Sequence, residues 1–293
     1  MDNPTPCILL VDNGSFRLES TLSLRKIAAA LTAEIGHLVH PVSLLHSTKV
    51  KAEKLNEIPA EIFEPFLKKK SEEGMNSFLV VPLFFGHSAA IYEYLPQRVL
   101  EMREVWPELE VRVAPCMVDV SDAADTGVAE VLAALVRKKI AEEGLEMPAV
   151  TLVDHGTPKK FVNDARNFLA GQLKVLLGDE VAVLEASSME RREGEEYDFN
   201  EPLLENLLGT EGFERNVVLL MLFISPGRHA GPGGDIAQIC EAAEKQHPGL
   251  RTVMSDLFAT HPAVVPLLAK RFRQGLASDP VDAEVPPPTV PGH

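Results

Sequence analysis

Residues 8–36 read ILLVDNGSFRLESTLSLRKIAAALTAEIG, and residues 150–178 read VTLVDHGTPKKFVNDARNFLAGQLKVLLG. Each stretch begins with a short apolar run, passes through a turn that contains glycine, and ends in a segment with apolar residues three and four positions apart. This pattern predicts a strand, a turn and a helix. The two stretches align without a gap at a shift of 142 residues, which pairs Asp12 with Asp154 and Gly36 with Gly178. The agreement predicts an internal duplication.

A second pair of segments, residues 78–111 and 217–253, extends the match. Pro107 pairs with Pro248 at a shift of 141, so a gap lies near the Gly-His turn. Residues 78–85 and 217–224 are apolar at nearly every position, which is typical of strands covered on both faces in a parallel sheet. We therefore predict an α/β fold of two tandem Rossmann-like domains in a pseudo-two-fold relation, each a four-stranded parallel sheet flanked by helices.

The repeat also predicts how the chain is divided. With 293 residues, the chain is long enough for two domains of ordinary size. We assign residues 1–145 to the first copy and 146–276 to the second. Residues 277–293 are rich in proline and lack hydrophobic periodicity, so we expect a disordered tail. The charged segment 53–73 is interpreted as a solvated helical face.

Composition narrows the classes of partner. The chain has 28 basic and 43 acidic residues, a net charge of −15, and no long block of Lys or Arg, so nucleic acid is not expected. No apolar run approaches the roughly 20 residues of a membrane-spanning helix, and the N-terminus lacks a signal-peptide pattern. The three cysteines are widely spaced in apolar surroundings, which favours reduced thiols. We expect a cytoplasmic protein without membrane contact.

Two histidines follow predicted strands of the second copy. His155 comes after the first strand and His229 after the third, on turns that contain glycine. In an open parallel sheet, ligands bind at the carboxyl ends of the strands. Two imidazoles at that edge predict a site for a first-row divalent metal ion. Glu185, near the end of the second strand, is a candidate third ligand or base.

These turns also have plainer interpretations. A His-Gly turn is often only a hydrogen-bonded turn, and the glycines after His229 could form a flexible connection or a phosphate cradle of low specificity. Lys159, Lys160 and Arg228 could meet a polycarboxylate ligand or could simply be exposed. His261 could line the pocket or begin the last helix.

The first copy has lost a donor. Asn13 stands in the position of His155, whereas His87 and His46 are aligned with the second histidine and with the glutamate, the latter at a shift of 139. Because an amide is a poor ligand for borderline metals, we expect this half to form a wall of the cleft. Weak binding through His46 and His87 is the alternative.

Several motifs together resemble a known family. The sequences VDHGT (153–157), LFISPGRHAGPGGDI (222–236) and LFATHP (257–262), with VDNGS and VPLFFGHS in the first copy, are similar to those of the class II chelatases that act on sirohydrochlorin. The resemblance covers roughly residues 7–275. It implies two fused copies with a tetrapyrrole bound in the cleft between them. It also implies that Co²⁺ or Fe²⁺, with Ni²⁺ as a further possibility, is inserted as a substrate without an organic cofactor.

The same resemblance implies roles for individual residues. The turn histidines, here His155 and His229, would hold the metal and accept the pyrrole protons, with Glu185 assisting. Substrate carboxylates would meet basic and backbone groups, here Thr157, Lys159, Lys160, Gly227, Arg228 and Gly231. The secondary candidates are His46, His87 and His261.

The resulting prediction is a chelatase of cobalamin or sirohaem synthesis, a monomer that contains an internal pseudo-dimer. The main alternative is a non-catalytic carrier of the tetrapyrrole or the metal. A hydrolase whose metal activates water is a third hypothesis.

Overall fold

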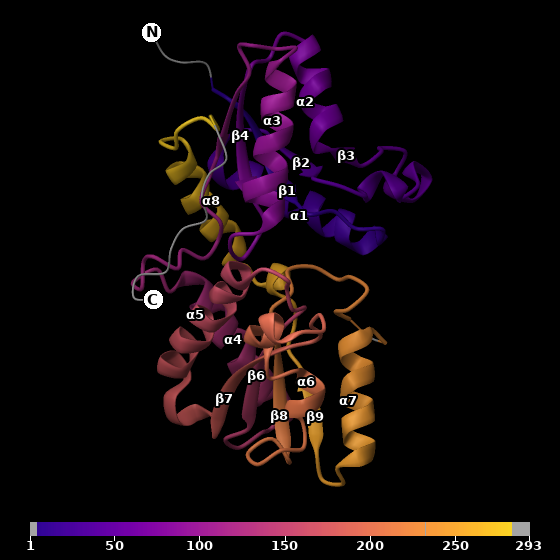
Figure 1. Ribbon diagram of the computed structural model, residues 1–293, viewed down its shortest axis with the longest axis vertical. Coiled ribbons are helices and arrows are strands. Elements are labelled where there is room, and N and C mark those ends of the chain that lie inside the picture. The colour runs from indigo at the N-terminus through magenta and orange to yellow at the C-terminus, as the bar shows by residue number, and fades with distance from the viewer. Residues whose placement is uncertain (1–4, 232, 283–293) are drawn as a thin grey trace. The chain divides into compact units, whose positions relative to one another are not determined.

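Residues 5–231 and 233–282 are described by the computed structural model, and they form two compact units. The first unit contains the described residues up to Ser121 and those from Val265 onward, and the second runs from Asp122 to Val264 (Figure 1). Each unit is built around one parallel β-sheet.

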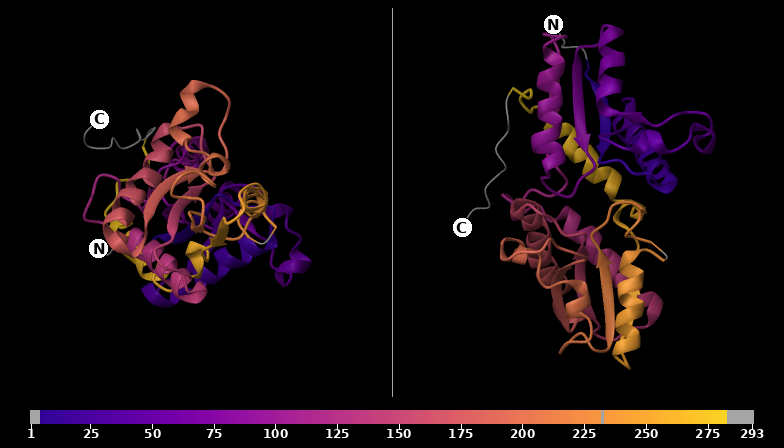
Figure 2. Two further views of the ribbon diagram at one scale, coloured as in Figure 1. Left: turned by 90° about the horizontal axis from the view of Figure 1, so that it is seen from below. Right: turned by 45° about the vertical axis from the view of Figure 1, so that its right-hand side comes forward.

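The first sheet has five parallel strands in the order β3-β2-β1-β4-β5. Alternate residues of its central strands face opposite sides, so Leu9 and Val80 pack under helices α2 and α3, whereas Leu79 contacts the end of α8. Helices α1 and α8 lie on that second face (Figures 1 and 2). The elements are β1 (Cys7–Asp12), α1 (Leu18–Ile35), β2 (Val39–Ser43), β3 (Glu61–Ile62), α2 (Phe63–Glu72), β4 (Ser77–Pro82), α3 (Leu95–Arg103), β5 (Glu110–Val113) and α8 (Val264–Gly275).

The segment 53–73 differs from its prediction as a solvated helical face. It forms part of a 3₁₀ turn (Ala52–Leu55), then the short edge strand β3, and then α2. Phe63, Phe66 and Leu67 of α2 are buried in the core of the first unit. The high charge of the segment hid these apolar residues, which share one face of a helix.

The second sheet has four parallel strands in the order β7-β6-β8-β9. This matches the order β2-β1-β4-β5 of the first sheet. Helices α4 and α5 cover one face, and α6 and α7 cover the other. The predicted α/β class with parallel sheets is confirmed. The predicted four strands are found in the second sheet, whereas the first has a fifth, the edge strand β3. The duplication itself stays a prediction. The elements are α4 (Gly127–Glu143), β6 (Ala149–Asp154), α5 (Lys160–Leu177), β7 (Val183–Ser188), α6 (Leu204–Leu207), β8 (Asn216–Met221), α7 (Asp235–Gln246) and β9 (Arg251–Met254).

Each compact unit contains a helix from the other predicted copy. Helix α4 precedes the predicted boundary at residue 145 but belongs to the second unit, and α8 belongs to the first. In α8, Arg271 donates to the Met117 carbonyl at 2.6 Å. The compact units therefore do not follow the order of the sequence repeat, and the division into copies stays a prediction.

The beginning of the predicted disordered tail is ordered. Val281 is only 5% exposed, and its backbone N–H donates to the Val111 carbonyl at 2.8 Å. A buried apolar side chain next to a strand outweighs the local effect of proline. Residues 283–293 of the predicted tail lie outside the described residues.

All three cysteines are buried and free. Burial raises the pKa of the Cys116 thiol to about 12, so this thiol is protonated near neutral pH. Among the described residues, no helix combines the length and the apolar character needed to cross a membrane.

Candidate metal centre

Two histidine rings meet beyond the carboxyl ends of β6 and β8. His155 follows β6 directly, and His229 lies in the loop between β8 and α7. Their ring centroids are 4.6 Å apart and their planes are inclined by 76°. His155 keeps 45% of its side chain exposed and His229 keeps 28%, so both rings are accessible to a ligand.

Hydrogen bonds select the nitrogen that each ring can offer to a metal. The Nδ1 atom of His155 lies 3.1 Å from the Gly156 carbonyl, and Nδ1 of His229 lies 2.6 Å from a carboxylate oxygen of Asp235. Both partners are acceptors, and these contacts favour the tautomer in which Nδ1 carries the hydrogen. The lone pair of each neutral ring is then on Nε2, the atom that would coordinate a metal ion.

An acidic residue that the sequence did not single out lies beside this pair. Glu190 follows the end of β7, and its Oε1 atom lies 3.5 Å from Nε2 of His155. The Glu190 backbone N–H donates to the His155 carbonyl at 3.2 Å, which ties the two residues together. This carboxylate is in position to act as a further oxygen ligand or as a proton acceptor.

Glu185 is not brought to the two histidines. It lies within β7 opposite Thr151, three residues before Asp154, which ends β6. Its carboxylate lies 3.4 Å from the Lys174 ammonium on α5. The structure thus brings Glu190, and not Glu185, to the end of this strand beside His155.

The turn that carries His155 is fixed by Asp154 and Gly156. The Asp154 carboxylate accepts hydrogen bonds from the Gly156 N–H at 3.1 Å and from the Ser188 hydroxyl at 2.7 Å. Burial raises the pKa of Asp154, while the nearby Arg166 opposes that shift. Gly156 has φ +89, and an added Cβ would lie 1.8 Å from the Glu190 carbonyl oxygen. Only glycine fits here.

The predicted basic residues lie around the same turns. The Lys159 N–H donates to the Thr157 hydroxyl at 3.1 Å, immediately before α5. The Lys160 ammonium lies 4.0 Å from Asp164. Arg228 is 75% exposed, and its Nε lies 3.6 Å from Asp235.

The remaining predicted residues of the second unit shape nearby backbone. The Gly227 N–H donates to the Ala230 carbonyl at 3.2 Å, and the Gly231 carbonyl accepts from Gly234 at 3.1 Å. His261 accepts a hydrogen bond from the Ala263 N–H on its Nδ1 at 3.2 Å, next to the start of α8.

The corresponding edge of the first unit is arranged differently. His46 is exposed and has φ +66, and its ring centroid lies 5.0 Å from that of Phe16. His87 is half-buried, and its Nε2 lies 3.3 Å from the Tyr92 hydroxyl. Burial lowers the pKa of His87 to about 4, so the ring is neutral near pH 7. Asn13 offers no imidazole at this edge.

The strand register corrects one pairing that the sequence predicted. Asp12 is opposite Ser43, and Asp154 is opposite Ser188, so the second strands correspond at a shift of 145. At this shift the counterpart of Glu185 is His40, and that of His46 is Arg191. The shift of 139 that paired His46 with Glu185 is therefore wrong.

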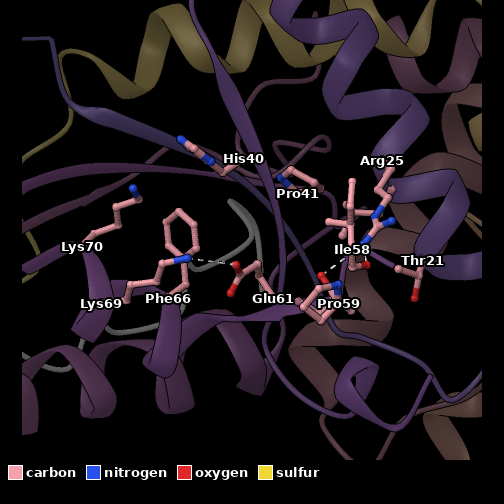
Figure 3. A pocket seen from close by; sticks show the side chains of 13 residues that line it. Thr21, Arg25, His40, Pro41, Ile58, Pro59, Glu61, Phe66, Lys69 and Lys70 are labelled. Carbon is pink, nitrogen blue, oxygen red and sulfur yellow. Dashed lines mark hydrogen bonds and ion pairs between the residues drawn. The ribbon is translucent and has the colours of Figure 1, made fainter. Parts of the chain in front are cut away.

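A separate cavity of about 260 Å³ lies in the first unit, between α1, β2 and α2 (Figure 3). Its cationic side chains already have partners. The Arg25 guanidinium donates to three backbone carbonyls, Lys69 lies 3.6 Å from Glu61, and Lys70 lies 2.6 Å from Glu73. The cavity contains none of the predicted site residues.

The number of ligands is small. Among residues 5–231 and 233–282, no group of three or more His, Cys, Asp or Glu side chains is arranged to hold a metal ion. The centre therefore consists of two imidazoles with Glu190 at its margin. Such a set leaves coordination positions open, unlike the closed four-ligand shell of a structural metal site.

Part of the chain matches a known protein family. Residues 149–275 match the CbiX family. No curated protein is similar to the chain at a significant level. Among solved structures, SirB from Bacillus subtilis with Fe³⁺ has a TM-score of 0.66 at 16% identity, covering 92% of this chain and 95% of its own.

Two further structures are similar along most of their length. The cobalt complex of the sirohydrochlorin chelatase SirB from Bacillus subtilis subspecies spizizenii has a TM-score of 0.66 at 14% identity, covering 94% of this chain and 99% of its own. CbiX, described as the terminal enzyme of sirohaem biosynthesis in denitrifying bacteria, has a TM-score of 0.57 at 16% identity, covering 91% and 98%. At these identities the similarity establishes the fold.

Proposed function

We propose that this chain, whose residues 149–275 match the CbiX family, is a class II chelatase that inserts Co²⁺ or Fe²⁺ into a sirohydrochlorin-like tetrapyrrole. One observation carries the proposal. The ring centroids of His155 and His229 lie 4.6 Å apart. Each Nδ1 lies beside a hydrogen-bond acceptor, which leaves Nε2 of each ring as the atom that can bind a metal ion. SirB structures with Fe³⁺ and with cobalt support a metal ion as the cargo.

The ligand set suits a metal that must be released. Two imidazoles and one carboxylate hold a first-row divalent ion less firmly than a closed shell of four protein ligands does. The open positions can accept tetrapyrrole nitrogens while the histidines still hold the ion. The ion can then pass to the macrocycle by ligand exchange, without a fully dissociated intermediate.

The same side chains can balance the protons. Insertion of a divalent ion into the macrocycle displaces two N–H protons. The Nε2 atoms that the ion leaves can each accept a proton, and Glu190 lies 3.5 Å from one of them. Lys159, Lys160 and Arg228 provide positive charge near the site, which favours the carboxylates of such a substrate.

The proposal is tested by following the absorption spectrum of sirohydrochlorin with Co²⁺ and the full chain. We expect multiple turnovers in the wild-type protein. His155→Ala and His229→Ala should each lower kcat/KM by about 10²–10⁴-fold, because each removes a ligand and a proton acceptor. His46→Asn is the matched control, since it alters an exposed histidine at the corresponding edge of the first unit.

Two results would contradict the proposal. Stoichiometric binding of sirohydrochlorin and Co²⁺ without turnover would make the chain a carrier. Full turnover in both histidine variants would move the reaction to another site.

A further inference from the structure

The turn of His155 is supported by a buried polar cluster that consists of Arg166, Ser188 and Asn200, referred to below as the latch. These side chains are 2%, 0% and 0% exposed. They come from α5, from the end of β7 and from the loop between β7 and α6. A polar cluster buried this deeply is costly unless its groups are paired, so its pairing shows what it holds in place.

The Asn200 side chain forms hydrogen bonds with both the N–H and the carbonyl of Thr157. Its Oδ1 accepts from the Thr157 N–H at 2.9 Å, and its Nδ2 donates to the Thr157 carbonyl, also at 2.9 Å. A third bond joins Nδ2 to the Tyr197 carbonyl at 3.0 Å. One side chain thereby fixes the residue two positions after His155.

Arg166 connects Asn200 to the residue before the histidine. Its Nη1 donates to the Asn200 carbonyl at 3.2 Å and also to the Ser188 hydroxyl. The Ser188 hydroxyl in turn donates to Asp154 at 2.7 Å, and the Arg166 guanidinium lies 3.6 Å from that carboxylate. The latch therefore holds Asp154 on one side of His155 and Thr157 on the other.

The first unit supports the equivalent turn with two buried hydroxyls. The Ser15 N–H donates to the Ser47 hydroxyl at 3.3 Å, and that hydroxyl donates to Ser43 at 2.7 Å. At the shift of 142 that aligns α1 with α5, Leu24 takes the place of Arg166. Asp12, the counterpart of Asp154, accepts from the Gly14 N–H at 3.0 Å, and burial raises its pKa to about 6. The unit with His155 thus holds its turn through the Asn200 amide and the Arg166 guanidinium, whereas the unit with Asn13 uses hydroxyls.

We propose that Arg166 and Asn200 are positioning residues for metal binding: they hold the His155 turn so that its Nε2 meets that of His229. This proposal rests on the proposed function. It also makes the loop between β7 and α6 part of the metal centre, because Asn200 belongs to that loop.

The test uses the full chain with Asn200→Ala, which removes both bonds to Thr157. We expect faster hydrogen exchange of the Thr157 amide and a Co²⁺ affinity that is lower by about 10–100-fold. We also expect kcat to fall while KM for sirohydrochlorin stays the same, because the latch positions the metal ligand and not the macrocycle.

Thr151→Val is the matched control. It breaks a buried hydrogen bond of 2.7 Å to Ser187 in the same sheet, three residues before Asp154. It should destabilise the fold to a similar extent but leave Co²⁺ affinity and kcat unchanged. If the effect comes from a general loss of stability, Co²⁺ affinity and kcat should fall in both variants. If Asn200 positions the metal ligand, they should fall in Asn200→Ala alone.

The outcomes are distinguishable. Wild-type protein that neither binds Co²⁺ nor turns over contradicts the proposed function before any variant is compared. If the wild-type protein is active and Asn200→Ala binds Co²⁺ with unchanged affinity, the positioning role of the latch is contradicted and the proposed function is not. If Asn200→Ala does not fold, Asn200→Asp keeps the acceptor for the Thr157 N–H and loses the donors, and it should show a smaller loss in the same direction.

Discussion

At the residue scale, the turn after the first strand of each sheet requires glycine, and the residue before that glycine differs between the units. Gly14 and Gly156 both have positive φ, +86 and +89. An added Cβ would lie 1.7 Å from the Leu45 carbonyl oxygen in one unit and 1.8 Å from that of Glu190 in the other. The turn geometry is therefore common to both units, and the imidazole of His155 occurs in the second.

This pairing gives a matched pair of variants. Gly14→Ala and Gly156→Ala should each destabilise their unit by about 2 kcal/mol or more, because both add a clash to a strained φ. Co²⁺ binding, measured by titration below the unfolding temperature, should be lost in Gly156→Ala and kept in Gly14→Ala. Equal loss of binding in both variants would argue against a site in the second unit.

Asp12 predicts a pH dependence of stability. Its folded-state pKa of about 6 lies above the ordinary value of 3.8 because of burial, so the folded state binds the proton more tightly. The ionised Asp12 carboxylate lowers the free energy of unfolding above pH 6, and this effect disappears as the pH falls toward 4. Asp12→Asn should therefore stabilise the first unit by up to about 3 kcal/mol at pH 8 and by less at pH 5.

Urea unfolding at the two pH values measures this difference. Asp154→Asn is the control, since it leaves the buried Arg166 without its carboxylate and should destabilise the protein at both pH values. If Asp12→Asn raises the free energy of unfolding equally at pH 5 and pH 8, the raised pKa of Asp12 is contradicted.

The sequence could locate His155 and His229 because each follows a continuous apolar strand, and parallel strands end at one edge. It could not locate Glu190. The repeat was extended through the second strand at a shift of 139, whereas the registers of β2 against β1 and of β7 against β6 give 145. Counting from the end of the strand, and not along the repeat, would have found Glu190.

At the element scale, the last helix of each predicted copy packs in the other compact unit. Helix α4 packs on the second sheet and α8 on the first. Neither position follows from the sequence, since an apolar helix face does not specify which of two sheets it covers. The short strand β3 was also missed, because two residues carry no readable alternation.

The packing of α4 and α8 predicts where core mutations act. Leu268 in α8 and Leu132 in α4 are both 0% exposed. Leu268→Ala should speed hydrogen exchange in β1 and β4, and Leu132→Ala should do so in β6 and β8, each with a cost of about 2–5 kcal/mol. If Leu268→Ala instead speeds exchange in β6 and β8, and Leu132→Ala in β1 and β4, each helix packs within its own half of the sequence.

At the scale of the whole molecule, the chain should bind one metal ion. The second unit brings two imidazoles together, whereas the first has Asn13 and a half-buried His87 that contacts Tyr92. Equilibrium dialysis with Co²⁺ should give a stoichiometry of one per chain, unchanged in His87→Ala. Two equivalent ions per chain would show that the first unit also binds metal.

The most direct test of the metal centre is an anomalous difference map from a crystal soaked with Co²⁺. We predict one peak, at about 2.0–2.2 Å from Nε2 of both His155 and His229. No peak should lie beside Asn13 and His87. A peak bound by other residues, with the two histidines of the second unit unoccupied, would contradict the account.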